Sequence, residues 1–379
     1  MDFKTLICDL AAPGVRDLSP YRPGKPISEL QRELGLPEIV KLASNENPAG
    51  PSPVAVSALL EQVPEIARYP DGNGFLLKNA IAVHLNVPFE CITLGNGSND
   101  VLELLVRAFV TSSEEIIYSE YAFAVYPILA KAVNAASQVS KSLHWGHDLA
   151  AMRSAVNNRT RMVFIANPNN PTGTWLTAEE LHAFMRDISP SVIVVLDEAY
   201  FEYASNPLTN ATGYPTDSHQ WLDAYPNLVV TRTFSKAYGL AGLRVGYSLS
   251  HPDIADMLNR VRQPFNANSL ALCAAEAVLS DHKYLQTSVS QNARGLKQLT
   301  TGLRQLGLNY IPSVANFICV DMAMPAKSIY HALLEYGVIV RPLGPYSMPN
   351  HLRISIGTPD EMVKFLKILK LILMRIKAD

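Results

Sequence analysis

The most informative stretch of this chain is Thr231-Arg232-Thr233-Phe234-Ser235-Lys236-Ala237-Tyr238-Gly239-Leu240-Ala241-Gly242-Leu243-Arg244-Val245-Gly246. Val229 and Val230 come directly before it, which indicates that Lys236 follows a buried strand. Burial or a cationic neighbour lowers the pKa of a lysine, and such a lysine becomes a nucleophile that forms Schiff bases. Lys236 is therefore a candidate catalytic amine.

Donors suited to an anion surround this lysine. Thr233 and Ser235 carry hydroxyls and Arg244 carries a guanidinium, a set that fits a phosphate monoester. An aldehyde for the lysine and a phosphate for these donors together describe pyridoxal phosphate. A lone lysine among glycines is usually a solvated loop residue, so the rest of the chain has to decide between the two interpretations.

The middle of the chain alternates short apolar runs with helical patterns. Strands are expected at 92–94, 115–118, 162–166, 192–196 and 228–231, and helices at 101–109 and 179–188. Near-continuous apolar strands between helices indicate a sheet that is buried on both faces, hence an α/β fold with a mostly parallel central sheet. Ligands of such sheets bind beyond the carboxyl ends of the strands, where Lys236 would lie.

Polar residues follow two other predicted strands. Asp197 can keep a pyridine nitrogen protonated, and Tyr200 can donate to a phenolic oxygen on the same ring. Asn170, held in a stiff turn by Pro171, can aim its amide at that oxygen. The plainer alternatives are a helix N-cap with a packed tyrosine, and a rigid turn before a helix that begins with a Thr177 capping box.

A second candidate anion site is the loop Gly95-Asn96-Gly97-Ser98-Asn99-Asp100, between a predicted strand and the helix at 101–109. Free backbone amides and the dipole at a helix start attract phosphate. The loop matches neither the dinucleotide fingerprint nor the Walker pattern, and glycines in such turns are common without a ligand.

Composition narrows the class of protein. The chain has 379 residues, 48% of them hydrophobic and 17% charged, which is ordinary for a globular protein with a sizeable core. A net charge of -2 argues against a nucleic-acid or anionic-membrane surface. No apolar run approaches the ~20 residues that span a bilayer, and the first residues lack a signal-peptide core. A cytoplasmic protein is expected.

Metal and disulfide chemistry is not favoured. The four cysteines, at 8, 91, 273 and 319, are far apart and form no Cys-x-x-Cys motif, so we expect them reduced. His144 and His147 have no supporting cluster of acids or cysteines, and we expect them in a surface loop.

Taken together, these motifs resemble those of the fold-type I, pyridoxal-phosphate-dependent aminotransferases, and within them the histidinol-phosphate aminotransferase family. The matching motifs are Ser44-Asn45-Glu46-Asn47-Pro48, Arg68-Tyr69-Pro70-Asp71, residues 95–100, Asn169-Asn170-Pro171-Thr172-Gly173, Asp197-Glu198-Ala199-Tyr200, Ser235-Lys236 through Arg244, and Leu352-Arg353-Ile354-Ser355. They run in family order from about residue 19 to residue 357, and their joint occurrence is highly specific.

The resemblance implies a role for each matching residue. Lys236 would form the Schiff base and Asp197 would pair with the pyridine nitrogen, while Asn170 and Tyr200 would bind the phenolic oxygen. The cofactor phosphate would be held by Ser98, Asn99, Thr233, Ser235 and Arg244. The ring-stacking aromatic would be Phe123, the first residue of an aromatic-x-x-Tyr pattern, with Tyr121 as a competing candidate.

Substrate recognition is implied for residues near both ends of the chain. Arg353 would take the α-carboxylate of the amino acid, whereas Tyr21 and Arg341 would help to bind a substrate phosphate, and Asn45 is a further expected substrate contact. Tyr69 would reach the cofactor phosphate of a neighbouring subunit, which implies a homodimer with shared sites.

The implied reaction is transamination between histidinol phosphate and 2-oxoglutarate, giving imidazole acetol phosphate and glutamate, in histidine biosynthesis. An aromatic amino acid aminotransferase is the alternative, and a threonine-phosphate decarboxylase-like lyase or a non-catalytic binding protein on the same scaffold is less favoured. A large domain is expected at 48–265, and a smaller one from 1–47 with 266–379. Helices at 269–280, 281–306 and 360–377 and strands at 316–320, 337–340 and 351–356 are expected in the smaller domain.

Overall fold

The computed structural model describes residues 3–21 and 23–378. Its larger sheet has seven strands in the order β2-β10-β9-β8-β7-β3-β4. Their bounds are β2 Ile92–Gly95, β3 Glu115–Ser119, β4 Ala136–Ser140, β7 Thr160–Ala166, β8 Ile193–Asp197, β9 Leu228–Thr233 and β10 Gly246–Ser250. β10 runs antiparallel to both its neighbours, whereas the other neighbouring pairs are parallel. The predicted mostly parallel central sheet is confirmed.

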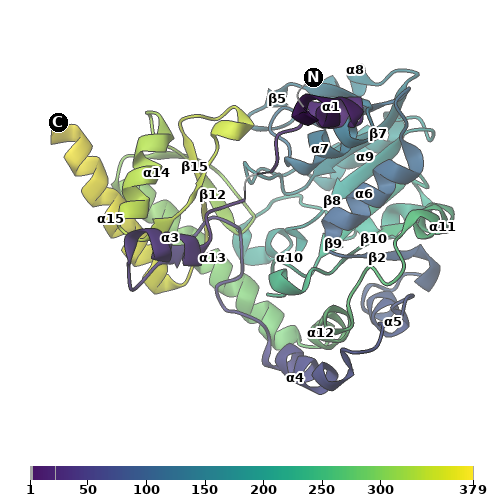
Figure 1. Ribbon diagram of the computed structural model, residues 1–379, viewed down its shortest axis with the longest axis horizontal. Helices are drawn as coiled ribbons and strands as arrows, with labels where there is room; N and C mark the ends of the chain where they lie inside the picture. The colour runs from purple at the N-terminus through teal and green to yellow at the C-terminus, as the bar shows by residue number, and fades with distance from the viewer. Residues whose placement is uncertain (1–2, 22, 379) are drawn as a thin grey trace.

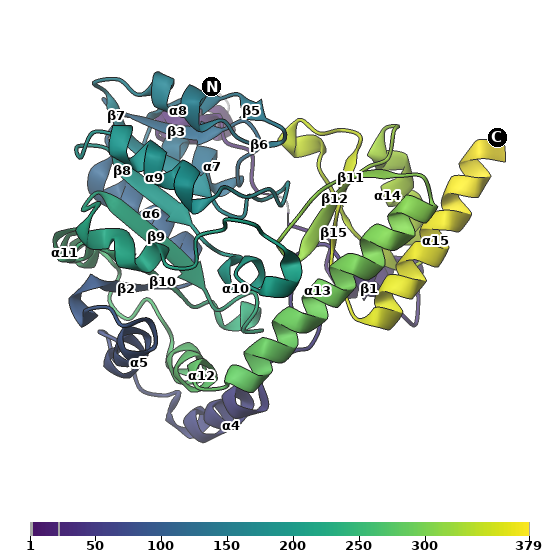
Figure 2. The same ribbon diagram turned by 180° about the vertical axis from the view of Figure 1, so that it is seen from behind.

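Helices cover both faces of this sheet because its strands are apolar on both sides (Figures 1 and 2). In β7, Phe164 packs in one core with α6 (Ser98–Phe109), α7 (Val125–Ala132) and α11 (Pro252–Val261). Its neighbours Val163 and Ile165 point the other way, as alternate strand residues do. They pack in a second core with α5 (Phe75–Leu85), α8 (Leu149–Ala155), α9 (Ala178–Asp187) and α12 (Ser269–Leu279).

A smaller antiparallel sheet has the strand order β11-β12-β15-β14. Its bounds are β11 Asn309–Ile311, β12 Phe317–Asp321, β15 His351–Ser355 and β14 Arg341–Pro342, and β1 (Val40–Lys41) pairs in parallel with β13 (Val338–Ile339) beside it. Three helices pack on it around a separate core: α13 (His282–Gln305), α14 (Ala326–Glu335) and α15 (Pro359–Ala378). Figure 2 shows α13 running from α12 across to α15, so that it spans both parts of the molecule.

The remaining helices and strands lie around these two sheets. They are α1 Phe3–Leu10, α2 Pro13–Arg16, α3 Ile27–Leu34, α4 Pro53–Gln62, α10 Phe201–Ala204, β5 Ser142–Leu143 and β6 Gly146–His147. The predicted helices and strands are all present, with ends that differ by a few residues. The capping box at the start of α9 is also confirmed, since Thr177 and Glu180 each accept a hydrogen bond from the other's backbone amide.

Two sequence expectations need comment. The expected boundary at 265 assigns α12 to the smaller domain, yet Ala271, Ala274 and Ala275 pack in the core of the larger sheet. The domain boundary at 265 stays a prediction, and this packing favours a later one. The surface-loop expectation is wrong for His147, which is buried, with its Nε2 2.9 Å from the carbonyl oxygen of Ala166.

The cysteines are free thiols, two of them buried. Across residues 3–21 and 23–378, no three acidic, histidine or cysteine side chains gather as metal ligands. None of the helices described is long and apolar enough to cross a membrane.

Candidate active site

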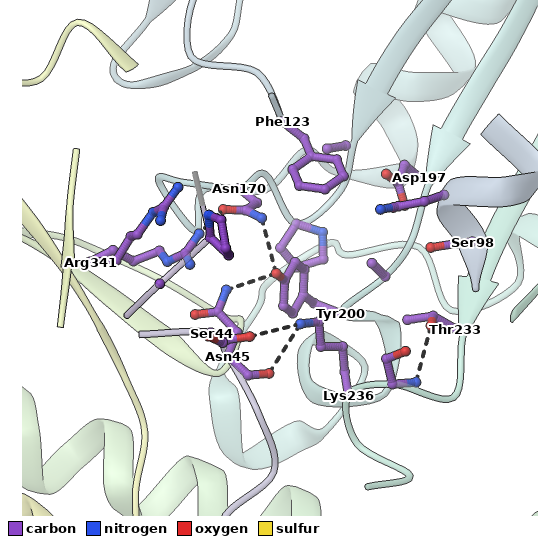
Figure 3. A pocket seen from close by; sticks show the side chains of 18 of the residues that line it. Ser44, Asn45, Ser98, Phe123, Asn170, Asp197, Tyr200, Thr233, Lys236 and Arg341 are labelled. Carbon is purple, nitrogen blue, oxygen red and sulfur yellow. Dashed lines mark hydrogen bonds between the residues drawn. The ribbon is translucent and has the colours of Figure 1, made fainter. Parts of the chain in front are cut away.

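A cavity of about 210 Å³ lies where the carboxyl ends of β7, β8 and β9 face the smaller sheet. Most of the predicted site residues line it, as Figure 3 shows for those it labels: Tyr21, Asn45, Ser98, Asn99, Phe123, Asn170, Asp197, Tyr200, Thr233, Ser235, Lys236, Arg244, Arg341 and Arg353. The site lies where it was expected, beyond the carboxyl ends of the strands, because parallel strands end at the same edge of the sheet.

Lys236 reaches into the cavity from the loop after β9. Its Nζ donates to the carbonyl oxygens of Ser44 and Asn45, each at 3.3 Å (Figure 3). Burial, together with the nearby charges of Arg353 and Arg244, lowers the pKa of the amine to about 7. A partly buried lysine with this lowered pKa holds a large share of neutral, nucleophilic amine near neutral pH.

Asp197 ends β8 and is held by two hydroxyls. Oη of Tyr126 donates to its Oδ2 at 2.8 Å, and Oγ1 of Thr231 donates to its Oδ1 at 3.2 Å. Burial raises the pKa of the carboxyl, while these hydrogen bonds oppose the rise. Tyr126 was missed as a site residue, although it closes the same aromatic-x-x-Tyr pattern that pointed to Phe123.

The hydroxyl of Tyr200 lies between two amides. Nδ2 of Asn45 donates to Oη at 2.9 Å and Nδ2 of Asn170 donates to it at 3.2 Å. Burial raises the pKa of this phenol to about 12, against an opposing effect of Arg353. Tyr200 therefore stays protonated at neutral pH and can act as a hydrogen-bond donor.

The start of α6 and the loop after β9 form an anion cradle. Nη1 of Arg244 donates to Oγ of Ser235 at 2.9 Å, and the backbone of Ser235 donates to Oγ1 of Thr233 at 3.1 Å. Gly97 has a φ of 84°, and a Cβ there would lie 2.4 Å from Nη2 of Arg244. Only glycine lets the guanidinium approach the start of the helix this closely.

Phe123 lies at the rim of this cavity, with its ring directed inward (Figure 3). Tyr121, the competing candidate, packs its ring on Trp145 with a centroid distance of 5.2 Å. This placement favours Phe123 as the residue that stacks on a ring bound in the cavity.

Two buried arginines from the smaller sheet close the cavity. Arg341 on β14 and Arg353 on β15 are directly paired across the two strands, and both are less than a tenth exposed. Arg353 donates to Oδ1 of Asn170 and to the carbonyl oxygen of Ala43, while the guanidinium of Arg341 lies 5.5 Å from the ring centre of Tyr21. Two cations buried side by side call for anionic ligands.

Tyr69 is the predicted site residue that lies outside the cavity of its own chain. Its side chain is 83% exposed and stacks on Phe265, with ring centres 4.7 Å apart. This exposed position is compatible with the expectation that Tyr69 contacts a neighbouring subunit and not the site of its own chain. The expected contact to a neighbouring subunit stays a prediction.

Known proteins resemble this chain over nearly its whole length. The family model for class I and II aminotransferases matches residues 37–369. Histidinol-phosphate aminotransferase 1 of Nitrosococcus oceani is 53% identical and covers 98% of each chain. Histidinol-phosphate aminotransferase 2 of Pseudomonas fluorescens Pf0-1 is 56% identical, with 97% of this chain and 98% of the relative aligned.

A solved structure gives the same result. The histidinol-phosphate aminotransferase of Sinorhizobium meliloti, crystallised with pyridoxal-5'-phosphate, is 28% identical and superposes with a TM-score of 0.88 over 97% of this chain and 98% of that one. The chain therefore belongs to the class I and II aminotransferases and, within them, to the histidinol-phosphate aminotransferase family.

Proposed function

We propose that this protein is a histidinol-phosphate aminotransferase of histidine biosynthesis. It exchanges an amino group between histidinol phosphate and 2-oxoglutarate, giving imidazole acetol phosphate and glutamate. The observation that carries the proposal is one cavity in which a partly buried lysine of lowered pKa faces two buried arginines. The lysine supplies the reactive amine, and the arginines bind substrates that carry an anion at one end.

The residues around the cavity fit pyridoxal 5'-phosphate. The cradle at the start of α6 offers backbone amides, two hydroxyls and Arg244 to a phosphate. Asp197, a carboxylate steadied by Tyr126 and Thr231, suits a protonated ring nitrogen. Lys236 is the amine for the aldehyde, and Phe123 offers a flat face for the ring.

When bound, pyridoxal phosphate supplies an aldehyde that receives the amino group and a ring that accepts electrons from the substrate. Nζ of Lys236, with a pKa near 7, then takes and returns the proton at the substrate's α-carbon. Tyr200 and Asn170 offer donors to the cofactor's phenolic oxygen. Asp197 supplies the negative charge that keeps the ring nitrogen protonated.

Arg353 and Arg341 divide the recognition of the anions. Arg353 is proposed to take the carboxylate of glutamate and to contribute to the site for the phosphate of histidinol phosphate. Arg341, with Tyr21 beside its guanidinium, is proposed to bind mainly that phosphate. Asn45 stays a predicted substrate contact, although both atoms of its amide already have partners.

A homodimer with shared sites is part of the proposal. Exposed apolar side chains gather on α4, α5 and the turn between them: Val54, Val56, Leu60, Val63, Ile66, Phe75 and Leu76. Tyr69 follows α4 on the same segment. We propose that a second copy of the chain covers this face and that Tyr69 then reaches the partner's cofactor phosphate. A cytoplasmic location also stays a prediction.

Steady-state kinetics with competing amino donors test the function. We expect histidinol phosphate to have a kcat/KM at least about a hundredfold above phenylalanine and tyrosine, with 2-oxoglutarate as acceptor, because only it presents a phosphate to the two arginines. A preference for phenylalanine or tyrosine would replace this function with the aromatic alternative. The relatives at 51–56% identity favour the first outcome.

A further inference from the structure

Tyr200 receives hydrogen bonds on its oxygen from two sides. A phenol has one proton to donate and accepts through its oxygen, and here Asn45 and Asn170 both donate to that oxygen. The Tyr200 proton therefore has no acceptor in either amide. This proton can be donated to a group in the cavity, so Tyr200 acts toward that group as a hydrogen-bond donor.

This conclusion depends on which way each amide is turned, and the partners of the amide oxygens decide that. Oδ1 of Asn170 accepts from Nη1 of Arg353 at 2.5 Å, and a guanidinium never accepts. The Asn170 amide can therefore present only its NH₂ group to Tyr200.

Ser355 orients the other amide. Its Oγ accepts from the backbone N–H of Asn45 at 2.8 Å and donates to Oδ1 of Asn45 at 3.0 Å. Ser355 is 3% exposed and Asn45 is 1% exposed. Turning the amide over would leave the buried serine proton without an acceptor, because both recorded hydrogen bonds of this hydroxyl go to Asn45.

We infer that Ser355 is a positioning residue of the active site, which acts through the Asn45 amide to make Tyr200 a donor to the cofactor's phenolic oxygen. Arg353 and Ser355 are two residues apart on β15, so one face of one strand orients both amides. The inference rests on the proposed function, since it needs a cofactor oxygen beside Tyr200.

A donor aimed at the phenolic oxygen stabilises negative charge on it and so favours the deprotonated form of the bound cofactor. If Tyr200 no longer donates to this oxygen at all times, the bound cofactor should lose its proton at a higher pH. The pH midpoint of the change in visible absorbance of the holoenzyme should therefore rise. The charged groups around the cavity, Lys236, Asp197, Arg244, Arg341 and Arg353, are the same in every variant proposed below.

The experiment is a spectroscopic pH titration of the purified holoenzyme. Ser355→Ala weakens one hydrogen bond to the cofactor's phenolic oxygen, so it should raise the midpoint by about 0.5 to 1 pH unit. Ser355→Thr, which keeps the hydroxyl, should restore it. Ser248→Ala is the matched control, because Ser248 is buried on β10 and its Oγ has no partner among the described residues.

A second variant tests the route through Asn45. Asn45 has a φ of 54°, so Asn45→Gly keeps the backbone conformation while it removes the amide. Asn45→Gly should raise the midpoint, as Ser355→Ala does. It also keeps the inference testable if Ser355→Ala fails to fold. In the double variant Ser355→Ala should add no further shift, because its effect passes through the amide that is already missing.

Tyr200→Phe separates this inference from the proposed function. If Tyr200→Phe leaves the midpoint unchanged, the proposed contact between Tyr200 and the cofactor is wrong. If Tyr200→Phe raises the midpoint while Ser355→Ala and Asn45→Gly leave it at the wild-type value, the contact stands and the positioning role of Ser355 is wrong. An additive shift in the double variant also overturns the role.

Discussion

Lys236 owes its reactivity to its surroundings. Its ordinary pKa of 10.5 falls to about 7 in the folded protein, so the folded apoprotein disfavours the charged amine. The cost of this charge to the stability of the folded protein is present in full below about pH 7. It declines as the pH rises from 7 to 10.5, and it is gone above 10.5, where the unfolded chain has also lost the proton.

Lys236→Met should therefore stabilise the apoprotein at low pH. We expect its melting temperature at pH 6 to exceed that of the wild type by at least about 3 °C, which for a chain of 379 residues corresponds to roughly 2.4 kcal/mol. The gain should shrink towards pH 10. Thermal melts at pH 6, 8 and 10 check this, with the exposed Lys297→Met as control. A gain that does not depend on pH would contradict the cause.

Alanine substitutions of Arg341 and Arg353 should affect different substrates. Charge-assisted hydrogen bonds to a phosphate are worth about 1.5–3 kcal/mol each, so Arg341→Ala should raise the KM for histidinol phosphate at least about tenfold. The KM for glutamate should change much less. Arg353→Ala should damage both half-reactions, because both substrates present an anion there. Unchanged kinetics with histidinol phosphate in Arg341→Ala would contradict the phosphate assignment.

At the scale of elements, the start of α6 works only because a glycine precedes it. Gly97→Ala would force a Cβ into contact with Nη2 of Arg244 at a φ of 84°. Displacing this guanidinium removes charge-assisted hydrogen bonds, so the Kd of the apoprotein for pyridoxal phosphate should rise about ten- to a hundredfold.

A nearby glycine is the matched control for this prediction. A Cβ at Gly242 would meet no atom within 4 Å, and its φ is not positive. Gly242→Ala should therefore bind pyridoxal phosphate within about threefold of the wild type, which is less than 1 kcal/mol. Fluorescence titration of both apoproteins compares them. Equal weakening in the two variants would mean that the steric argument at Gly97 is wrong.

For the whole molecule, the position of Tyr69 makes oligomeric state part of the function. Tyr69→Phe removes one hydroxyl that is predicted to reach the partner's cofactor phosphate, so the Kd for pyridoxal phosphate should rise about three- to tenfold. Sedimentation velocity should still detect a dimer, and Tyr336→Phe, at the C-terminal end of α14, should bind pyridoxal phosphate like the wild type. A monomer with full activity at assay concentration would contradict the shared site.

Local patterns predicted the elements well because their physical basis is local. Apolar runs predicted β3, β7, β8 and β9, and the capping box predicted the start of α9. The site residues came from motifs, and strand ends in a parallel sheet meet at one edge, so Lys236, Asp197 and Asn170 were expected together. The domain boundary and the place of α12 were harder to predict from the sequence, because an alanine-rich helix can pack against either core.

Short-range periodicity was enough to predict the fold class, and the joint occurrence of short motifs along the chain was enough to predict the family and most residues of the cavity. The contacts between those motifs became known from the packing of the folded chain. Tyr126 meets Asp197 across 71 positions, and Ser355 meets Asn45 across 310. Such pairings depend on the order of strands and the packing of two sheets, which no local pattern records, and they decide the direction in which Tyr200 holds its proton.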